Sequence, residues 1–226
     1  MIETIESVET STDPVRVVIV DDHDLFRTGL RNLLEEQGVD ILGEASTGSE
    51  AVRSVRELAP DVVVMDLNMP GMTGVEATRQ ITGFAPLTRV LVLTISDQDS
   101  DVLDAILAGA CGYMLKDSSI QDLMAGIRAA AVGESLISPT IASKVLQRVR
   151  STSSVPEIAE TIRAELSDRE IEVLKLIANG KDNAQIAGEL HISPKTVKNH
   201  ISNILMKLQI DNRIQAAVYA VKSGIV

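Results

Sequence analysis

Short apolar runs that alternate with helical patterns constrain the fold of this chain more than any other feature. The first run reads VRVVIV and, like the others, is rich in β-branched residues, which is typical of strands buried on both faces of a parallel sheet. The predicted strands span 15–20, 40–45, 62–65, 89–94 and 112–115, and the predicted helices span 24–37, 49–58, 73–83, 98–108 and 119–132. Five such units in about 120 residues predict an α/β fold with a five-stranded, doubly wound parallel sheet of the flavodoxin-like kind.

The alternation stops after Gly133, and a second, all-α part is expected near the end of the chain. Four short helical patterns follow there, with start signals such as Ser193-Pro194, an N-cap residue before a proline at the first helical position. Between the two parts, Pro139 opens one more helix, and STSSVP at 151–156 is typical of a linker. We expect a disordered N-terminal arm at 1–14, the α/β domain at 15–135, a linker helix and flexible linker at 136–160, and a four-helix domain at 161–226.

Charge is divided unevenly along the chain, whose formal net charge is −11. Residues 1–159 carry 12 Lys and Arg against 24 Asp and Glu, whereas residues 160–226 carry 9 against 8. Within the second range, residues 193–213 carry four Lys and Arg and a single Asp. The acid therefore belongs to the front of the chain, and one basic surface is left near its end. Two parts with different electrostatic roles are expected.

Composition excludes several classes of protein. No apolar run approaches the ~18–20 residues of a membrane helix, and the acidic N-terminus does not resemble a secretory signal. A single cysteine, Cys111, allows neither an intrachain disulfide nor a cysteine-based zinc site. With no Trp and only two Phe and two Tyr, the chain offers few aromatic platforms for base stacking. A cytoplasmic location and no membrane partner are expected.

Polar side chains follow the ends of the predicted strands. Asp21 and Asp22 follow the first strand, Asp66 follows the third, Thr94 ends the fourth and Lys116 follows the fifth. Because the carboxyl ends of parallel strands share one rim of the sheet, we expect these groups to converge there. Clustered carboxylates repel unless a cation joins them, and partly hydrated Mg²⁺ is the natural choice. With an ammonium to receive a phosphate, this set suits phosphoryl transfer.

Each of these residues alone also has a simpler interpretation. An Asp at a strand end often caps the next helix, a lone Thr94 is often only a strand-end hydroxyl, and a lone Lys116 is most often solvated. His23 suits a surface position at a helix start as well as a base or ligand, and Cys111 suits a small buried hydrophobe. The pattern leaves open whether Tyr113 is core or mobile. The convergence of all the groups on one rim favours the site.

The same residues resemble the receiver domain of two-component response regulators. The resemblance covers about 15–135 and rests on Asp21-Asp22, DLNMPGMTG at 66–74, Thr94 and AGACGYMLKD at 108–117. It implies that a sensor histidine kinase phosphorylates Asp66 as an acyl phosphate. The metal ligands that it implies for Mg²⁺ are Asp21, Asp22, Asp66 and the backbone carbonyl of Asn68. Lys116 would pair with the phosphate, Thr94 would swing toward it and Tyr113 would turn inward, which is a population shift triggered by a local charge change.

The helix expected at 194–208 has one polar face. Its apolar residues Val197, Ile201, Ile204, Leu205 and Leu208 follow helical spacing, and Lys195, Lys198, Asn199 and Ser202 fall on the other side. After a short helix and a tight turn, this pattern is typical of a helix-turn-helix, although a solvated charged face is the alternative. Lys and Asn can reach base edges, while Lys195, Thr196 and His200 suit phosphates. The expected DNA contacts are Lys195, Thr196, Lys198, Asn199, His200 and Ser202.

Residues 166–217, which begin LSDREIEVLKLIANGKDNAQIA, closely resemble the four-helix LuxR-type DNA-binding domain. One departure is Asp182, where a Ser or Thr cap is commoner, and Asp caps equally well. Ser202 is less basic than its counterpart in some members, which leaves the base preference open. The two resemblances together imply a response regulator of the NarL/FixJ type, which is not an enzyme. Phosphorylation of Asp66 would favour a homodimer that binds paired half-sites in double-stranded DNA and controls transcription.

Two other functions stay open on the sequence alone. Asp22-His23-Asp24 faintly resembles the DxD nucleophile motif of haloacid-dehalogenase-type phosphatases, although the linkage to a helix-turn-helix speaks against an enzyme. A regulator that works without phosphorylation and keeps the receiver only for dimerisation is the second alternative. The intact acidic residues, Thr94 and Lys116 speak against it.

Overall fold

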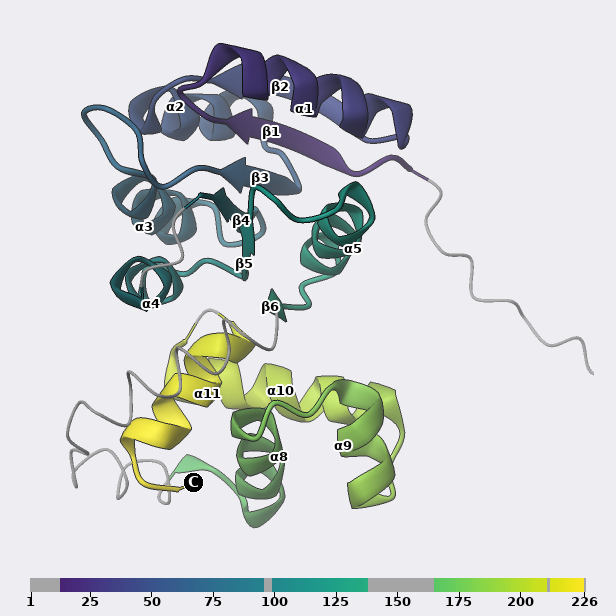
Figure 1. Ribbon diagram of the computed structural model, residues 1–226. Helices are drawn as coiled ribbons and strands as arrows, with labels where there is room; N and C mark the ends of the chain where they lie inside the picture. The colour runs from purple at the N-terminus through teal and green to yellow at the C-terminus, as the bar shows by residue number, and fades with distance from the viewer. Residues whose placement is uncertain (1–12, 96–98, 138–164, 211, 226) are drawn as a thin grey trace, which may run out of the picture.

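The structure, a computed structural model, describes residues 13–95, 99–137, 165–210 and 212–225, which form two parts (Figure 1). The first contains β1 (Arg16–Val20), α1 (Asp24–Glu36), β2 (Asp40–Ala45), α2 (Gly48–Leu58), β3 (Val62–Met65), α3 (Gly74–Phe84), β4 (Arg89–Thr94), α4 (Asp99–Leu107), β5 (Gly112–Leu115), α5 (Ile120–Ala131) and β6 (Leu136–Ile137). The second contains α8 (Asp168–Ala178), α9 (Asn183–Leu190), α10 (Pro194–Leu208) and α11 (Arg213–Lys222). Among the helices of these ranges, none is long and apolar enough to cross a membrane.

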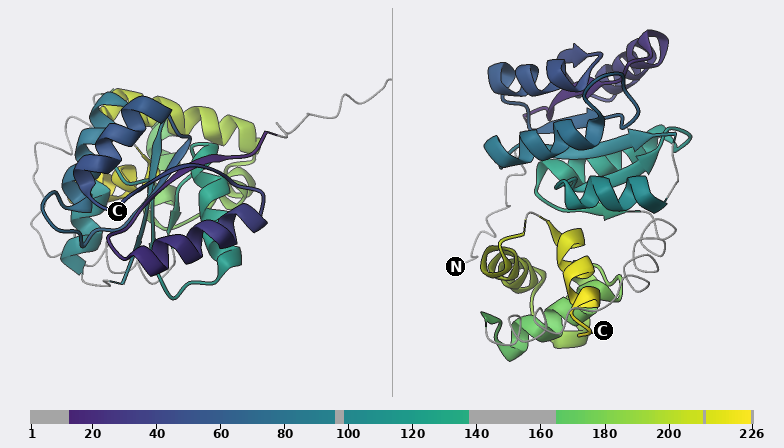
Figure 2. Two further views of the ribbon diagram at one scale, coloured as in Figure 1. Left: turned by 90° about the horizontal axis from the view of Figure 1, so that it is seen from above. Right: turned by 90° about the vertical axis from the view of Figure 1, so that its left-hand side faces the viewer.

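The sheet of the first part is parallel throughout, with the strand order β2-β1-β3-β4-β5-β6. Helices α1 and α5 cover one face and α2 and α3 cover the other (Figure 2). Val17 and Ile19 of β1 pack in one apolar cluster with Leu34 of α1. Val18, which lies between them, packs in a second cluster with Val55 of α2. The prediction that the apolar runs are strands buried on both faces is confirmed.

A sixth strand extends the predicted sheet of five. After α5, Gly133 takes a left-handed conformation (φ 75°) that turns the chain back toward the sheet. Gly112 of β5 then pairs with Leu136, and β6 contains only two residues. A strand of two residues is too short for a periodic pattern, which is why the sequence did not indicate it. The helix expected from Pro139, the linker at 151–156 and nearly all of the N-terminal arm lie outside the described residues.

The four helices of the second part begin where their capping residues predict. Ser167 accepts a hydrogen bond from the backbone N–H of Glu170, whose carboxylate reaches back to Ser167, and this capping box starts α8. Asp182 forms an equivalent box at the start of α9, so its departure from the commoner cap does not weaken the helix. Burial alone would raise the pKa of Glu170, but hydrogen bonds from Lys207, 2.7 Å away, and from Ser167 hold it below its usual value.

The two parts are packed against each other through α4 and α11 (Figure 1). Asn212 caps α11 and also donates a hydrogen bond of 3.0 Å to the backbone oxygen of Ala110. Gln215 donates one of 3.0 Å to the backbone oxygen of Ile106. A single apolar cluster runs from Tyr113 and α4 into the core of the second part. The receiver-like sheet and the helical domain are therefore in direct contact.

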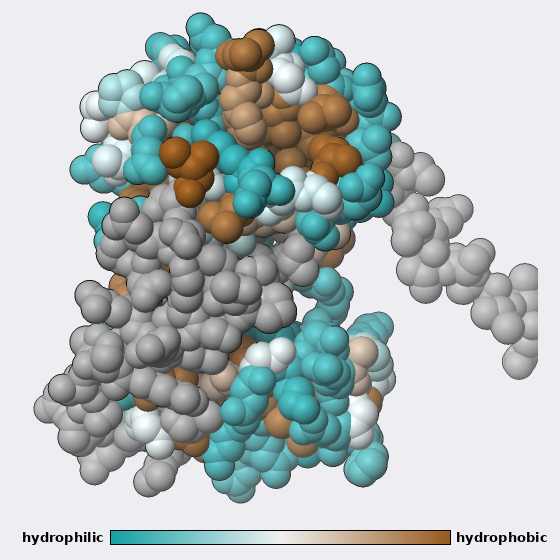
Figure 3. All heavy atoms as spheres, in the orientation of Figure 1, coloured by the Kyte–Doolittle hydropathy of each residue, from teal (hydrophilic) through white to brown (hydrophobic). Residues whose placement is uncertain are grey.

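Several large apolar side chains of the first part lie on its surface and not in its core. Leu25 and Leu33 of α1 and Val132 after α5 are exposed. Figure 3 shows an apolar area on the first part in the region of α1 and α5, whereas the second part is mostly polar from this side.

Candidate functional site

The register of the sheet places two of the predicted carboxylates side by side. Val20 of β1 pairs with Met65 of β3, so Asp21 and Asp66 leave the sheet together at its carboxyl edge. Backbone hydrogen bonds hold both positions, because Asp66 donates to Val20 (2.9 Å) and Asp21 donates to Ala45 of β2 (3.1 Å). The chain crosses over here, since β2 and β3 flank β1 on opposite sides. In open α/β sheets, ligands bind at this switch point.

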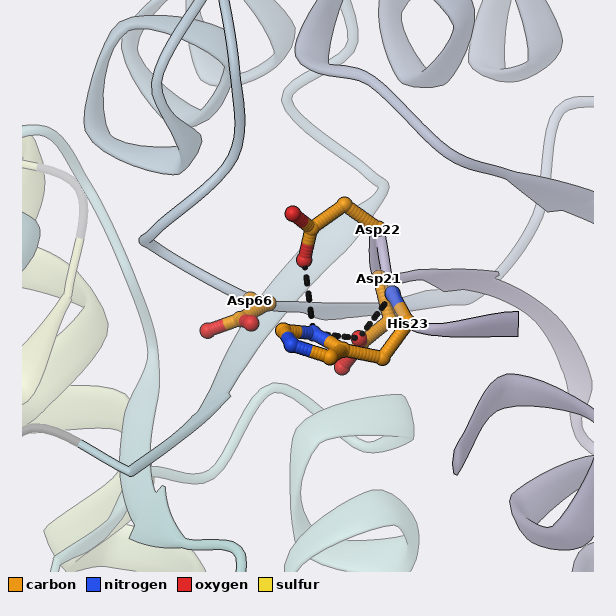
Figure 4. A group of neighbouring side chains, drawn as sticks. All are labelled: Asp21, Asp22, His23 and Asp66. Atoms are coloured by element: carbon orange, nitrogen blue, oxygen red, sulfur yellow. Dashed lines mark hydrogen bonds and ion pairs between the residues drawn. The ribbon is translucent and has the colours of Figure 1, made fainter. Parts of the chain in front are cut away.

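Four side chains form a compact cluster at this edge (Figure 4). Ligand atoms of Asp21, Asp22, His23 and Asp66 all lie within 4.8 Å of one another. Asp21 and Asp66 are buried, and the Asp22 side chain is 27% exposed. His23 Nδ1 lies 2.8 Å from Asp22 Oδ1, yet this buried oxygen has no donor in hydrogen-bond geometry among the described residues. Three converging carboxylates, one with an unpartnered oxygen, fit a hard divalent cation such as Mg²⁺.

Asp66 is oriented from two sides. Its Oδ1 accepts a hydrogen bond of 2.7 Å from the backbone N–H of Leu67 and lies 3.5 Å from that of Asn68. Its Oδ2 lies 2.7 Å from Lys116 Nζ. The carboxylate is thereby fixed in a pocket lined by donors, which is the arrangement that a charged nucleophile needs to hold one direction.

Lys116 connects the strands of the site. Its Nζ lies 2.6 Å from Asp21 Oδ2 as well as 2.7 Å from Asp66 Oδ2, and its side chain is only 10% exposed. Burial by itself lowers the pKa of Lys116, but the hydrogen bonds and the charges of the two carboxylates outweigh it and raise that pKa above its usual value. The raised pKa favours the charged ammonium between the two carboxylates.

The other predicted receiver residues lie around this centre. Thr94 ends β4, is fully buried and accepts the backbone hydrogen bond of Lys116. Tyr113 is also fully buried and already faces inward, in the apolar cluster that α4 shares with the second part. Asn68 is exposed in the loop after Asp66. Cys111 is buried, and burial raises the pKa of its thiol to about 12, which matches the small hydrophobe expected there.

Two further residues reach the site, and the sequence analysis did not single them out. Lys116 Nζ lies 4.6 Å from the centroid of the Phe26 ring. Arg27 donates 2.6 Å to the backbone oxygen of Asp21 and pairs with Asp24 and Glu44, which fixes the loop between β1 and α1. Asp24 is therefore turned away from the cluster, with 86% of its side chain exposed. Phe26 and Arg27 both lie in the first turn of α1, shortly after Asp21 and Asp22.

Gly74 at the start of α3 provides a test of how tightly the Asp66 loop is held. A Cβ at this position would lie 2.0 Å from the backbone oxygen of Asp66. Gly74→Ala is therefore expected to lower the free energy of unfolding by about 3 kcal/mol and to disorder the Asp66 carboxylate. The measurement is urea unfolding together with the NMR signals of the loop.

Gly83 is the matched control for this prediction, because it lies in the same helix with no atom within 4 Å of its added Cβ. Gly83→Ala should leave the unfolding free energy unchanged or raise it by about 0.5–1 kcal/mol. Equal stability of Gly74→Ala and Gly83→Ala would contradict the packing described for the loop.

Helix α10 carries the residues expected to contact DNA. Val197, Ile204 and Leu208 are buried against the other helices. The exposed residues of the expected set are Lys195, Lys198, Asn199 and Ser202, and the half-buried ones are Thr196 and His200. The hydroxyl oxygen of Thr196 lies 2.8 Å from that of Ser193, the N-cap of the helix.

One end of this polar face is turned toward the first part. Lys198 Nζ lies 2.8 Å from a carboxylate oxygen of Glu134, which precedes β6. Lys198 and Ser202 line a cavity of about 650 Å³ between the two parts, together with Arg89. Lys195 and Asn199 do not line it. In this arrangement, Lys198 is paired with a carboxylate of the first part.

The two parts match two known protein families. Residues 17–128 match the response regulator receiver domain, and residues 164–220 match the family described as bacterial regulatory proteins, luxR family. The chain is 46% identical over 213 residues to the transcriptional regulatory protein LiaR of Bacillus subtilis (strain 168), which covers 94% of this chain and 99% of LiaR.

Solved structures agree with these families. The response regulator ChrA of a heme-sensing two-component system has 35% identity and a TM-score of 0.52, over 95% of this chain and all of ChrA. A structure of two RcsB dimers bound to two parallel DNAs has 25% identity and a TM-score of 0.54, over 93% of this chain and 98% of RcsB. The chain belongs to the two-component response regulators that join a receiver domain to a LuxR-type DNA-binding domain.

Proposed function

We propose that Asp66 is the residue through which this response regulator receives its signal. A carboxylate oxygen of Asp66 attacks the phosphorus of a phosphohistidine on a sensor histidine kinase, the P–N bond breaks, and an acyl phosphate forms. The observation that supports Asp66 is its position, buried and 2.7 Å from the Lys116 ammonium. Lys116 is then placed to neutralise charge on the transferring group. The test is a gain of one phosphoryl group when the full chain meets acetyl phosphate and Mg²⁺, measured by intact mass.

The donor set favours Mg²⁺ as the cofactor. Asp22, Asp66 and the backbone carbonyl of Asn68 would hold the ion, and Asp21 would assist. When bound, the ion supplies a positive charge that reduces repulsion between the carboxylates and the incoming phosphate. Asp21 also forms an ion pair with Lys116, which partly neutralises its carboxylate.

The phosphatase alternative has little support in the site. A nucleophile on the first strand would be Asp22, and its partner in the DxD motif would be Asp24. The Asp24 side chain is exposed and paired with Arg27 instead. The phosphoryl group on Asp66 is thus regulatory, and the protein is not an enzyme in this proposal.

Transcription control follows from the second part. We propose that phosphorylation favours a homodimer whose two helical domains bind paired half-sites of double-stranded DNA in the cytoplasm. The RcsB structure, which contains dimers on DNA, supports this assembly. Helix α10 would enter the major groove, with its exposed residues directed at the duplex.

Two kinds of contact are expected along α10. Lys195 lies in the first turn and would contact phosphates, whereas Lys198 and Asn199 lie one turn deeper and would reach base edges. Lys195→Ala should weaken binding to all sequences alike and reduce the salt slope by ~1. Lys198→Ala or Asn199→Ala should cost ~1–3 kcal/mol on a specific duplex and much less on a scrambled one.

The measurement is binding to a duplex selected from a random pool by the wild-type protein, and to its scrambled form, at several salt concentrations. Glu134→Gln serves as the control for Lys198, because it removes the ion pair without touching α10. If Lys198→Ala and Asn199→Ala leave the ratio of specific to scrambled affinity unchanged, α10 does not read bases.

A further inference from the structure

Two carboxylates and one aromatic ring lie close to the Lys116 ammonium. Asp21 and Asp66 lie at 2.6 and 2.7 Å, and the ring of Phe26 lies with its centroid at 4.6 Å. Phe26 is half-buried near the start of α1, so the ring and the ammonium meet in a region with little water. A cation over an aromatic face is attracted by the ring quadrupole, and more strongly when it is desolvated.

Phosphorylation and cation binding at the site would change both carboxylates but not the Phe26 ring. Once a phosphoryl group is attached to Asp66, one oxygen of that side chain is bonded to phosphorus, and the negative charge moves from the carboxylate to the phosphoryl oxygens. A cation bound at the cluster of Asp21, Asp22 and Asp66 would compete with Lys116 for the Asp21 carboxylate. The contact with Phe26 involves neither a metal ligand nor the oxygen that would be phosphorylated.

We propose that Phe26 is a positioning residue that holds the Lys116 ammonium in the pocket while its carboxylate partners change. This inference rests on the proposed function of Asp66. The ring keeps the long lysine side chain beside Asp66 while the negative charge moves from the carboxylate to the phosphoryl oxygens. It thereby delivers the ammonium to the phosphoryl oxygens during transfer.

Packing alone would predict something different. Phe26 also contacts the apolar cluster beneath α1, a role that Leu would fill with little change. An electronic role depends on the charge distribution of the ring and not only on its volume. Fluorine atoms withdraw electron density from the ring face while hardly changing its size, so fluorinated rings separate the two roles.

The chain suits this experiment because Phe26 and Phe84 are its only two phenylalanines. In a Phe84→Leu background, mono-, di- and trifluorinated phenylalanine can be incorporated at position 26 alone. The rate of phosphorylation by acetyl phosphate should fall with each added fluorine, by about 3- to 30-fold over the series. Phe26→Leu should slow it as much as the trifluorinated ring, and Phe26→Tyr should stay within about twofold of wild type. Mg²⁺ affinity, measured by NMR titration, should stay constant throughout.

Phe84 supplies the matched control. Its ring also lies under a cation, with Arg56 at 4.5 Å from the centroid, but it ends α3, roughly 16 Å along that helix from the Asp66 loop. Phe84→Leu with natural phenylalanine should phosphorylate at the wild-type rate. A phosphorylation rate that is independent of fluorination would overturn the proposal. This holds if Phe26→Leu is slow, because packing then explains the loss, and also if Phe26→Leu is as fast as wild type. Asp66→Asn in the same assay distinguishes a failure of this proposal from a failure of the proposed role of Asp66. Labelling of Asp66→Asn would show that Asp66 is not the phosphorylated residue.

Discussion

Asp66→Asn is expected to abolish phosphorylation of the full chain by acetyl phosphate and Mg²⁺. An amide has no charged oxygen with which to attack phosphorus, so no acyl phosphate can form. The substitution is nearly isosteric, and the Asn oxygen can still accept the hydrogen bond from the backbone N–H of Leu67, while the contact of the second carboxylate oxygen with Lys116 is lost. The fold should therefore survive while labelling drops to background. Intact mass measures the labelling, and thermal unfolding checks the fold.

Asp24→Asn is the matched control for this experiment, because Asp24 is an acidic residue of the same loop that points to solvent. It should be labelled like the wild type. Asp22→Ala should weaken Mg²⁺ binding and slow the transfer without abolishing it. Labelling of Asp66→Asn at the wild-type level would place the acceptor elsewhere, with Asp22 and Asp24 as the first candidates.

The sequence was sufficient to predict the sheet and the groups along its edge. A βα repeat fixes which end of each strand faces the ligand side, so residues directly after strands can be placed without coordinates. This is why Asp21, Asp66 and Lys116 are expected together, and the structure places an oxygen of each carboxylate within 2.7 Å of Lys116 Nζ. Capping residues similarly fixed the starts of α8 to α11.

Contacts between distant elements could not be predicted in this way. Phe26 follows helical spacing like any core residue, and nothing in its periodicity shows that its ring lies over Lys116 on another strand. The pair of Lys198 and Glu134 joins the two parts of the chain, and each residue alone has the pattern of a solvated charge. Such contacts depend on three-dimensional packing, which single-sequence patterns do not encode.

The packing between the two parts also suggests how a signal in the pocket reaches DNA. Tyr113 lies three residues before Lys116 and belongs to the same apolar cluster as residues of α4 and α11. Gln215 donates to a backbone oxygen in the last turn of α4, and Asn212 donates to one in the segment that leads from α4 into β5. A rearrangement around Thr94 and Tyr113 therefore bears directly on the contact that orients the second part.

Phosphorylation is accordingly expected to tighten dimerisation and DNA binding together, by roughly 5–150-fold, or ~1–3 kcal/mol of coupling free energy. Lys116→Ala should remove this gain, because in the proposed mechanism the ammonium is the group that pairs with the phosphate on Asp66. The variant should still bind DNA at the level of the unphosphorylated protein. Affinity for the selected duplex, measured with and without beryllofluoride and Mg²⁺ at one protein concentration, gives the coupling.

Arg53→Ala is the control for charge, since it removes one positive charge from the exposed surface of α2. Its coupling should equal that of the wild type, whereas that of Lys116→Ala should be near zero. A wild-type protein whose DNA affinity is the same with and without beryllofluoride would support the alternative in which the receiver serves only for dimerisation. If the affinity rises but dimerisation does not, the signal passes through the contact of α4 with α11 within one chain, and the dimer would not be the element that phosphorylation controls.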